Sequence, residues 1–215
     1  MGRCYIYVVD RDFGFAPNPF HGYCSLATCK PVIRKTAKIG DWIIGMGGSR
    51  LKATGRCIFA MRVTDAISFE EYWSNAAYAE KKPVRNGSSK MMVGDNIYHR
   101  ESKTGTWVQR DSHHSNHDGS ANEHNVMNDT KANRVLLSRH FFYFGRLAPI
   151  VPADILQKVG YRNGRNYRVY SDAVCAPLIR WLLDSYPNSV NLVEGDPFDF
   201  DSSERRYSVH DNRVR

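Results

Sequence analysis

The chain has 215 residues, of which 42% are hydrophobic and 12% aromatic, so it is long enough for one globular domain with a real core. Its formal net charge of +8 and pI near 9.3 favour an anionic partner. Five cysteines, an odd number, together with the lack of an N-terminal signal sequence or a membrane-length apolar run, argue against a disulfide-rich secreted protein and a membrane protein. We therefore expect a cytoplasmic protein.

The first predicted element is a buried strand at residues 3–9, because RCYIYVV is rich in tyrosine and β-branched residues. An aromatic loop follows, DFGFAPNPFHGY, in which glycine, proline and asparagine mark consecutive turns. Phe15, Asn18 and Phe20 of this loop are candidate ligand contacts. Pro31 then suits the first position of a short helix.

Two strands, at residues 40–48 and 56–65, are predicted next, and the glycine-containing turn between them suggests a hairpin or adjacent barrel strands. Ser68 is a good N-cap for a helix at residues 69–79. The basic, turn-rich segment 81–90 is predicted to lie on the surface.

The periodic pattern fails between residues 94 and 131, which contain few apolar side chains. A long segment of this kind inside a domain is usually disordered or functional. We expect a folded insertion that closes over the aromatic loop, because the segment is rich in histidine. It contains five of the eight histidines, namely His99, His113, His114, His117 and His124.

Regular structure is predicted again after the insertion. Residues 133–146 form the longest strand-like run, residues 152–159 a short helix, and residues 172–183 an apolar helix. We assign residues 1–190 to a single domain and predict a weakly ordered, charged tail at 191–215.

Cys29 is the strongest candidate nucleophile, because it directly precedes the predicted helix and adjoins Lys30. The helix dipole and the ammonium group both favour the thiolate form. A histidine of the insertion, with His113 and His114 as the candidates, would supply the base. Zinc binding by Cys24 and Cys29 would need further ligands from histidines, since no second cysteine pair exists. We therefore predict no metal and no cofactor; the alternative for the cysteines is a buried apolar role.

The insertion also carries the residue types of a nucleobase pocket. Asparagine and aspartate pair with base edges, and aromatic faces stack on bases with about 1–3 kcal/mol per base. Lys30 and Arg34 are cations suited to a phosphate. The remaining residues of this predicted ligand site are Asp95, Asn96, His99, Trp107, Asp111 and Ser112. The alternative is a solvated loop.

Several long motifs together resemble the nucleotide modification associated domain 2 family, and they cover most of residues 3–160. These motifs are GFAPNPF, CSLATCKPVIRKTAKIGDWIIG, GDNIYH, DSHHS and HFFYFGR. Members of this family occur in phages and bacteria beside DNA-modification systems, so the resemblance implies a role in that setting.

A second resemblance is architectural. A first strand, a helix leading to a strand that begins with Gly-Asp, the outgoing strand GRCIFAMRVTDA, and a later VPADI followed by a helix are similar to PUA-like domains, especially the EVE type. The resemblance implies an α+β fold, a PUA/EVE-like curved mixed β-barrel with flanking helices, whose pocket holds a base that is often modified. The long His-rich insertion at about residues 94–131 departs from that pattern.

The predicted function is recognition or processing of a modified nucleobase or nucleotide, in phage DNA modification or anti-phage defence. The expected partner is accordingly a modified nucleobase, a nucleotide or a nucleic acid. One alternative is an enzyme that acts on the nucleotide or base, with Cys29 or with His113 and His114 as catalytic groups. Another is a protein-interaction or inhibitor module that uses a basic surface. The oligomeric state stays open.

Overall fold

The computed structural model describes residues 2–215, and its largest sheet has five strands in the order β10-β1-β3-β4-β9. β1 and β3 run parallel, whereas the other neighbouring strands are antiparallel. The strand bounds are β1 (Arg3–Val9), β3 (Trp42–Gly47), β4 (Cys57–Arg62), β9 (Phe141–Tyr143) and β10 (Tyr167–Ser171). The strands predicted at 3–9, 40–48 and 56–65 are thereby confirmed, the last with an earlier end at Arg62.

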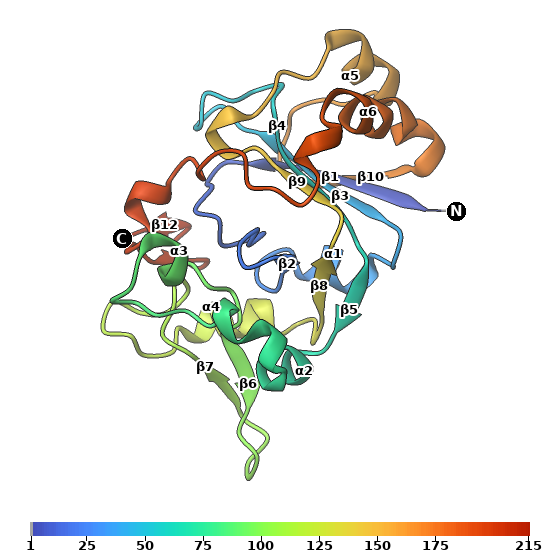
Figure 1. The fold of residues 1–215 in the computed structure, drawn as a ribbon. Helices are drawn as coiled ribbons and strands as arrows, with labels where there is room; N and C mark the ends of the chain where they lie inside the picture. Colours follow the sequence, from blue (N-terminus) through green and yellow to red (C-terminus); the bar gives the residue numbers. More distant parts are fainter. Residues whose placement is uncertain (1) are drawn as a thin grey trace. The chain divides into compact units, whose positions relative to one another are not determined.

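Two helices, α5 (Ala153–Val159) and α6 (Asp172–Ser185), lie together beside this sheet (Figure 1). The Ser171 side chain accepts a hydrogen bond from the amide of Val174 and so caps α6. The sheet and these helices form the first of two compact units, made of the residues up to Asp12, Ala37–Asp65 and Ser138–Phe198. Two 3₁₀ helices complete it, η2 (Gly145–Leu147) and η3 (Pro187–Ser189).

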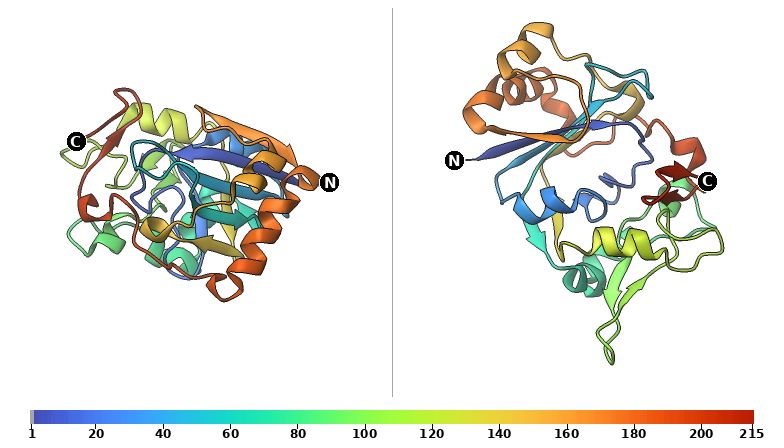
Figure 2. Two further views of the ribbon diagram at one scale, coloured as in Figure 1. Left: turned by 90° about the horizontal axis from the view of Figure 1, so that it is seen from above. Right: turned by 180° about the vertical axis from the view of Figure 1, so that it is seen from behind.

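The second unit comprises Phe13–Thr36, Ala66–Leu137 and Asp199–Arg215 and carries three small sheets, shown from two further directions in Figure 2. Their strands are β2 (Cys24–Leu26), β8 (Val135–Ser138) and β5 (Asp65–Ile67) in that order; β6 (Tyr98–Arg100) with β7 (Trp107–Gln109); and β11 (Tyr207–Ser208) with β12 (Arg213–Val214). The helices are α1 (Pro31–Thr36), α2 (Phe69–Ser74), η1 (Ala76–Lys81), α3 (Ser89–Met92), α4 (Glu123–Asp129) and η4 (Phe200–Ser202).

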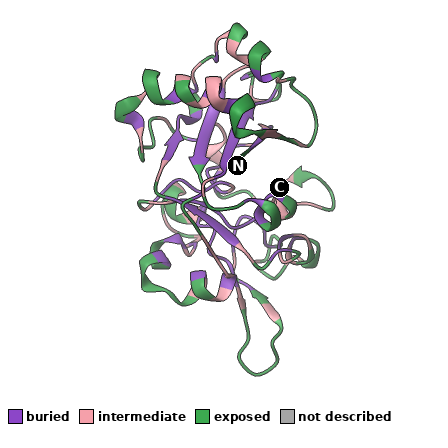
Figure 3. Cartoon of the chain, turned by 90° about the vertical axis from the view of Figure 1, so that its right-hand side faces the viewer, coloured by how far each residue is buried: buried purple, intermediate pink, exposed green. Residues whose placement is uncertain are grey.

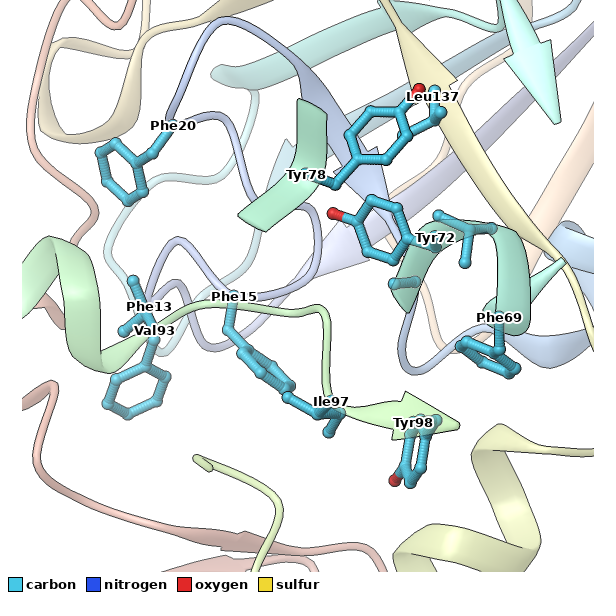
Figure 4. Close-up of a cluster of buried hydrophobic side chains, with 12 residues drawn as sticks. Phe13, Phe15, Phe20, Phe69, Tyr72, Tyr78, Val93, Ile97, Tyr98 and Leu137 are labelled. Atoms are coloured by element: carbon cyan, nitrogen blue, oxygen red, sulfur yellow. The ribbon is translucent and has the colours of Figure 1, made fainter. Parts of the chain in front are cut away.

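The core of the second unit is largely aromatic, as Figure 4 shows. Phe13, Phe15 and Phe20 of the aromatic loop are at most 7% exposed in it. The remaining rings and aliphatic side chains come from α2, η1, the insertion and β8, among them Phe69, Tyr72, Tyr78, Ile97, Tyr98 and Leu137. The aromatic loop is therefore part of the hydrophobic core of this unit.

The insertion at 94–131 is folded and contributes β6, β7 and α4 to the second unit. The rings of Phe13 and His113 lie 4.4 Å apart and those of Phe15 and His114 4.7 Å apart, so the insertion packs on the aromatic loop as predicted. The tip of the β6–β7 hairpin, at residues 100–106, is exposed (Figure 3).

Two predicted elements differ from the structure. The helix expected at 69–79 begins with the predicted N-cap at Ser68, which forms a capping box with Glu71. It ends at Ser74, however, and η1 follows it. The strand expected at 133–146 is broken into β8 and β9, which belong to different sheets. The break is a tight turn in which the Ser138 hydroxyl donates to the His140 carbonyl oxygen, 2.8 Å away, and accepts from the His140 amide.

The α+β class is confirmed, but the described strands close no barrel, since the five-stranded sheet ends in β9 on one side and β10 on the other. The charged segment 191–215, expected to be weakly ordered, forms η4 and the β11–β12 hairpin. No helix within residues 2–215 has the length and apolar character needed to cross a membrane.

Lys81 corrects the prediction that segment 81–90 lies wholly on the surface, because it is 1% exposed. Its ammonium group donates to the Asn18 side chain at 2.8 Å and to the Ser25 hydroxyl at 3.0 Å. The Ser25 hydroxyl in turn donates to Asp95, which also accepts from the Tyr72 hydroxyl. Burial lowers the pKa of Lys81 to about 8 and raises that of Asp95 to about 6, so both are predominantly charged at pH 7.

Replacing Lys81 by methionine is expected to lower the free energy of unfolding by about 3–5 kcal/mol, because Asp95 would remain buried without its counter-ion. Urea denaturation measures the loss. The exposed Lys103→Met is the control and should stay within about 0.5 kcal/mol of the wild type. If Lys81→Met were equally neutral, the buried pair would not stabilise this unit.

Candidate active site

Three polar side chains from separate segments of the second unit meet at one point: Cys29, His114 and Asp129. The Sγ atom of Cys29 lies 3.6 Å from Nε2 of His114. Nδ1 of the same imidazole lies 2.8 Å from Oδ2 of Asp129. A thiol, an imidazole and a carboxylate are thus connected in the same order as the groups of a catalytic triad.

Cys29 lies in a sharp turn between β2 and α1. Its φ angle is +54° and that of Lys30 is +37°, a left-handed conformation that costs non-glycine residues about 1–3 kcal/mol each. Two buried groups hold the turn. The Cys29 amide donates to Oδ1 of Asp129 at 2.7 Å, and Nε of Arg34 donates to the Cys29 carbonyl oxygen at 2.9 Å. Cys29 is partly exposed, whereas the other four cysteines are buried.

Asp129 is the last residue of α4 and is completely buried. Besides the Cys29 amide and the His114 imidazole, it accepts a hydrogen bond from the Tyr98 hydroxyl at 2.9 Å. Burial alone would raise its pKa, but His114 and Arg34 together hold that pKa below its usual value. Asp129 is therefore an anion at neutral pH.

The loop before α4 presents His114. Its amide donates to the Ser112 hydroxyl, and its carbonyl oxygen accepts from the side chains of Gln109 and Asn125. Burial opposes a charge on its imidazole. The Asp129 carboxylate and the Cys29 sulfur outweigh burial and raise the pKa of His114 to about 10. The geometry therefore favours an imidazolium beside the sulfur at neutral pH.

The neighbouring His113 has the opposite character. Its Nδ1 donates to the carbonyl oxygen of Arg205 at 2.7 Å, and its ring packs on Phe13 and Phe15. Burial, reinforced by the charge of His114, lowers the pKa of His113 to about 3. Of the two histidines named from the sequence, the structure places only His114 against Cys29, and His113 packs in the core.

The same three groups are also donor types that bind metals. The carboxylate, however, faces Nδ1 of His114 and not the Nε2 side where the sulfur lies. Both of its oxygens already accept hydrogen bonds, from Cys29 and from Tyr98 and His114. One donor atom from each of the three residues lies within 4.8 Å of the other two, which is one donor fewer than the four of a structural zinc site.

Arg34 was predicted to contact a phosphate, and its position corrects that prediction. It is 0% exposed. Besides the Cys29 carbonyl oxygen, its guanidinium donates to the carbonyl oxygens of Asp129, Ala132 and Arg134. Arg34 therefore joins the Cys29 turn to the end of α4 and presents no free face to a ligand.

Most of the other predicted ligand residues lie in the interior. Phe15 and Phe20 pack in the aromatic core, while Asn18 and Asp95 belong to the Lys81 network. Asn96 donates to the backbone of α2 and η1. These side chains support the unit from within, and their burial at 7% exposure or less argues against direct ligand contact.

The remaining predicted residues are nearer the surface. His99 stacks on Trp73 with ring centroids 4.1 Å apart, and Trp107 lies under the guanidinium of Arg100. Asp111 pairs with Arg206. Ser112 is buried in the His114 loop, and Lys30 is partly exposed beside Cys29.

The sequence analysis missed Asp129, Tyr98 and Asn125 as site residues. Asn122 followed by Glu123 is a helix-start signal that could have predicted α4. Within that helix, Asn125 and Asp129 are four residues apart and so share a face. No sequence signal places that face against His114.

We expect the two adjacent histidines to show opposite protonation states at pH 7. His114 should carry protons on both ring nitrogens up to about pH 10, and His113 should remain a neutral Nδ1–H tautomer down to about pH 3. Long-range ¹H–¹⁵N correlation spectra, assigned with His113→Gln and His114→Gln, measure both. A neutral His114 at pH 7 would contradict the ion pair.

The raised pKa of His114 also determines how its contribution to the free energy of unfolding changes with pH. The folded pKa of His114 lies above the ordinary value near 6.5. Its contribution to the free energy of unfolding is therefore complete below about pH 6.5 and is lost as the pH rises through about 10. The difference in stability between the wild type and His114→Gln should shrink over that range.

A family model described as nucleotide modification associated domain 2 matches residues 1–204, which confirms the resemblance found in the motifs. No curated protein matches the chain, and no solved structure does.

Proposed function

Since the chain belongs to the nucleotide modification associated domain 2 family, we propose that it is a cysteine-dependent enzyme that acts on a modified nucleobase or nucleotide. Cys29 is the nucleophile, His114 the general base and acid, and Asp129 the group that orients His114. We therefore prefer the enzyme, one of the alternatives predicted from the sequence, to a protein that only recognises a base.

The observation that carries the proposal is the contact between Sγ of Cys29 and Nε2 of His114. A protein that only binds a base needs neither a histidine at the cysteine nor a buried carboxylate behind that histidine. Burying Asp129 requires compensation, here the bonds from Tyr98, His114 and the Cys29 amide. Such an arrangement is typical of a site that moves a proton to and from sulfur.

The chemistry that suits these groups is acyl transfer at an amide or ester carried by the modified base. With its proton on the His114 imidazole, the Cys29 sulfur attacks the carbonyl carbon as a thiolate. The carbonyl π electrons move to oxygen, and their return expels the amine or alcohol, which receives the proton from His114. Water, deprotonated by His114, then attacks the thioester, and collapse of that intermediate releases the acid and the Cys29 sulfur with the proton back on His114.

The anionic partner follows from charge. The net charge of +8 supports a nucleotide or nucleic acid as the bearer of the modified base. The free state of all five cysteines supports a reducing, cytoplasmic setting. Phage DNA modification or the defence against it is the biological context that we propose.

The relation to PUA/EVE-like domains also stays a proposal. It is supported by the chain order: β1, then α1, then β3 directly after Gly40-Asp41, then β4. The parallel pairing of β1 with β3 beside the antiparallel pairing of β3 with β4 supplies the expected mixed character.

Iodoacetamide should alkylate Cys29 selectively, because the other four cysteines are buried and serve as internal controls. The rate should change little between pH 6 and 9, because the His114 imidazolium beside the sulfur persists up to about pH 10. His114→Gln should lower the rate at pH 7 by roughly tenfold or more, because a free thiol is only a few per cent ionised there. Mass spectrometry of the peptides measures site and rate.

A second test of the proposed function measures turnover of candidate substrates. Nucleotides carrying amide- or ester-linked groups should leave an acyl adduct on Cys29, and Cys29→Ala should abolish both adduct and turnover. Slow alkylation that rises with pH as for a free thiol would contradict a nucleophilic Cys29. Intact ligand binding in that case would favour a protein that recognises the base without chemistry.

A further inference from the structure

The segment after Glu204 binds the loop that carries His114 through an ion pair and hydrogen bonds. The guanidinium of Arg206 pairs with the carboxylate of Asp111 and donates to the Ser112 carbonyl oxygen at 2.8 Å. One residue further on, the Tyr207 amide donates to the His113 carbonyl oxygen at 2.7 Å. Arg206 and Tyr207 thus hold three consecutive residues of the loop, Asp111 to His113.

Asn125 of α4 forms hydrogen bonds both to the His114 loop and to the segment after Glu204. Its side-chain amide donates to the carbonyl oxygens of His114 at 2.7 Å and Tyr207 at 2.6 Å. Its Oδ1 accepts from the Val209 amide at 2.8 Å. Because Asn125 and Asp129 lie on one face of α4, the residue that holds the His114 backbone and the residue that holds its imidazole are fixed relative to each other.

The segment that follows Glu204 forms a β-hairpin of its own. β11 and β12 pair Tyr207 with Val214, and the amide and carbonyl of Arg206 exchange hydrogen bonds of 2.8 Å with Arg215. The match to the family ends at residue 204, so this hairpin lies beyond the part of the chain that the family defines. The hairpin and α4 lie close together in the views of Figures 1 and 2.

We propose that the C-terminal hairpin is a positioning clamp for the catalytic histidine, with Arg206 as its main polar anchor. It acts through His114, whose ring centroid lies 5.8 Å from that of Tyr207 on the hairpin. The inference rests on the proposed function for its catalytic consequence, and it adds a requirement for the hairpin that the triad alone does not imply. The physical reason is that a displacement of about 1 Å in a catalytic group lowers rates by as much as a hundredfold.

The test compares Arg206→Ala with Arg213→Ala in the full chain. Arg213 lies exposed on the same hairpin and its loss removes the same charge, so it is a matched control. Three readouts are taken from each protein: the iodoacetamide rate at Cys29 from pH 5 to 9, the His114 ring resonances, and the melting temperature.

Arg206→Ala should lower the alkylation rate at pH 7 by about tenfold or more. It should also make the rate rise with pH and shift the His114 resonances, while Arg213→Ala matches the wild type. If Arg206→Ala lowers only the melting temperature and leaves rate, pH profile and resonances unchanged, the clamp has no role in positioning and the inference fails.

The two proposals fail in different ways. If wild-type Cys29 reacts as an ordinary thiol, the proposed catalytic function fails, yet the His114 resonances of Arg206→Ala still decide whether the hairpin positions that ring. If wild-type Cys29 is reactive and Arg206→Ala leaves the resonances unmoved, the clamp fails and the triad stands.

Discussion

The candidate site in the second unit is organised around a buried anion, the carboxylate of Asp129. It accepts hydrogen bonds from the Cys29 amide, the Tyr98 hydroxyl and the His114 imidazole. A carboxylate without exposure to water is tolerated only when such donors and nearby cations compensate for lost hydration. Those donors come from the Cys29 turn, the β6–β7 hairpin and the loop that carries His114. The hydrogen bonds that stabilise the charge therefore also bring these three segments together.

Arg34 links the Cys29 turn and the end of α4 through their backbones. Its guanidinium binds backbone carbonyl oxygens at Cys29 and at the end of α4, so the strained turn and the buried acid share one rigid anchor. A left-handed conformation at two successive non-glycine residues persists only where its surroundings hold it. The strain at Cys29 and Lys30 is thus balanced by buried charge, which fits a site that must present one sulfur atom in one direction.

The sequence was informative about local structure and about residue types, and less so about burial. The sequence correctly predicted β1 from RCYIYVV, the start of α1 at Pro31 and the N-cap of α2 at Ser68. Lys81 and Arg34 were expected at the surface or at a ligand, because a cation is buried only when specific partners are available. Those partners lie far along the chain: 63 residues separate Lys81 from Asn18, and 95 separate Arg34 from Asp129.

By itself the sequence determined the α+β class, the family, and the pairing of a candidate nucleophile, Cys29, with a histidine-rich insertion. These depend on composition, on period and on short motifs, which neighbouring residues set. Only the tertiary structure decided that His114 and not His113 meets the sulfur, because adjacent residues in a loop point in different directions. It also placed Asp129, since a contact spanning 100 residues between Cys29 and that carboxylate follows from how the whole unit packs.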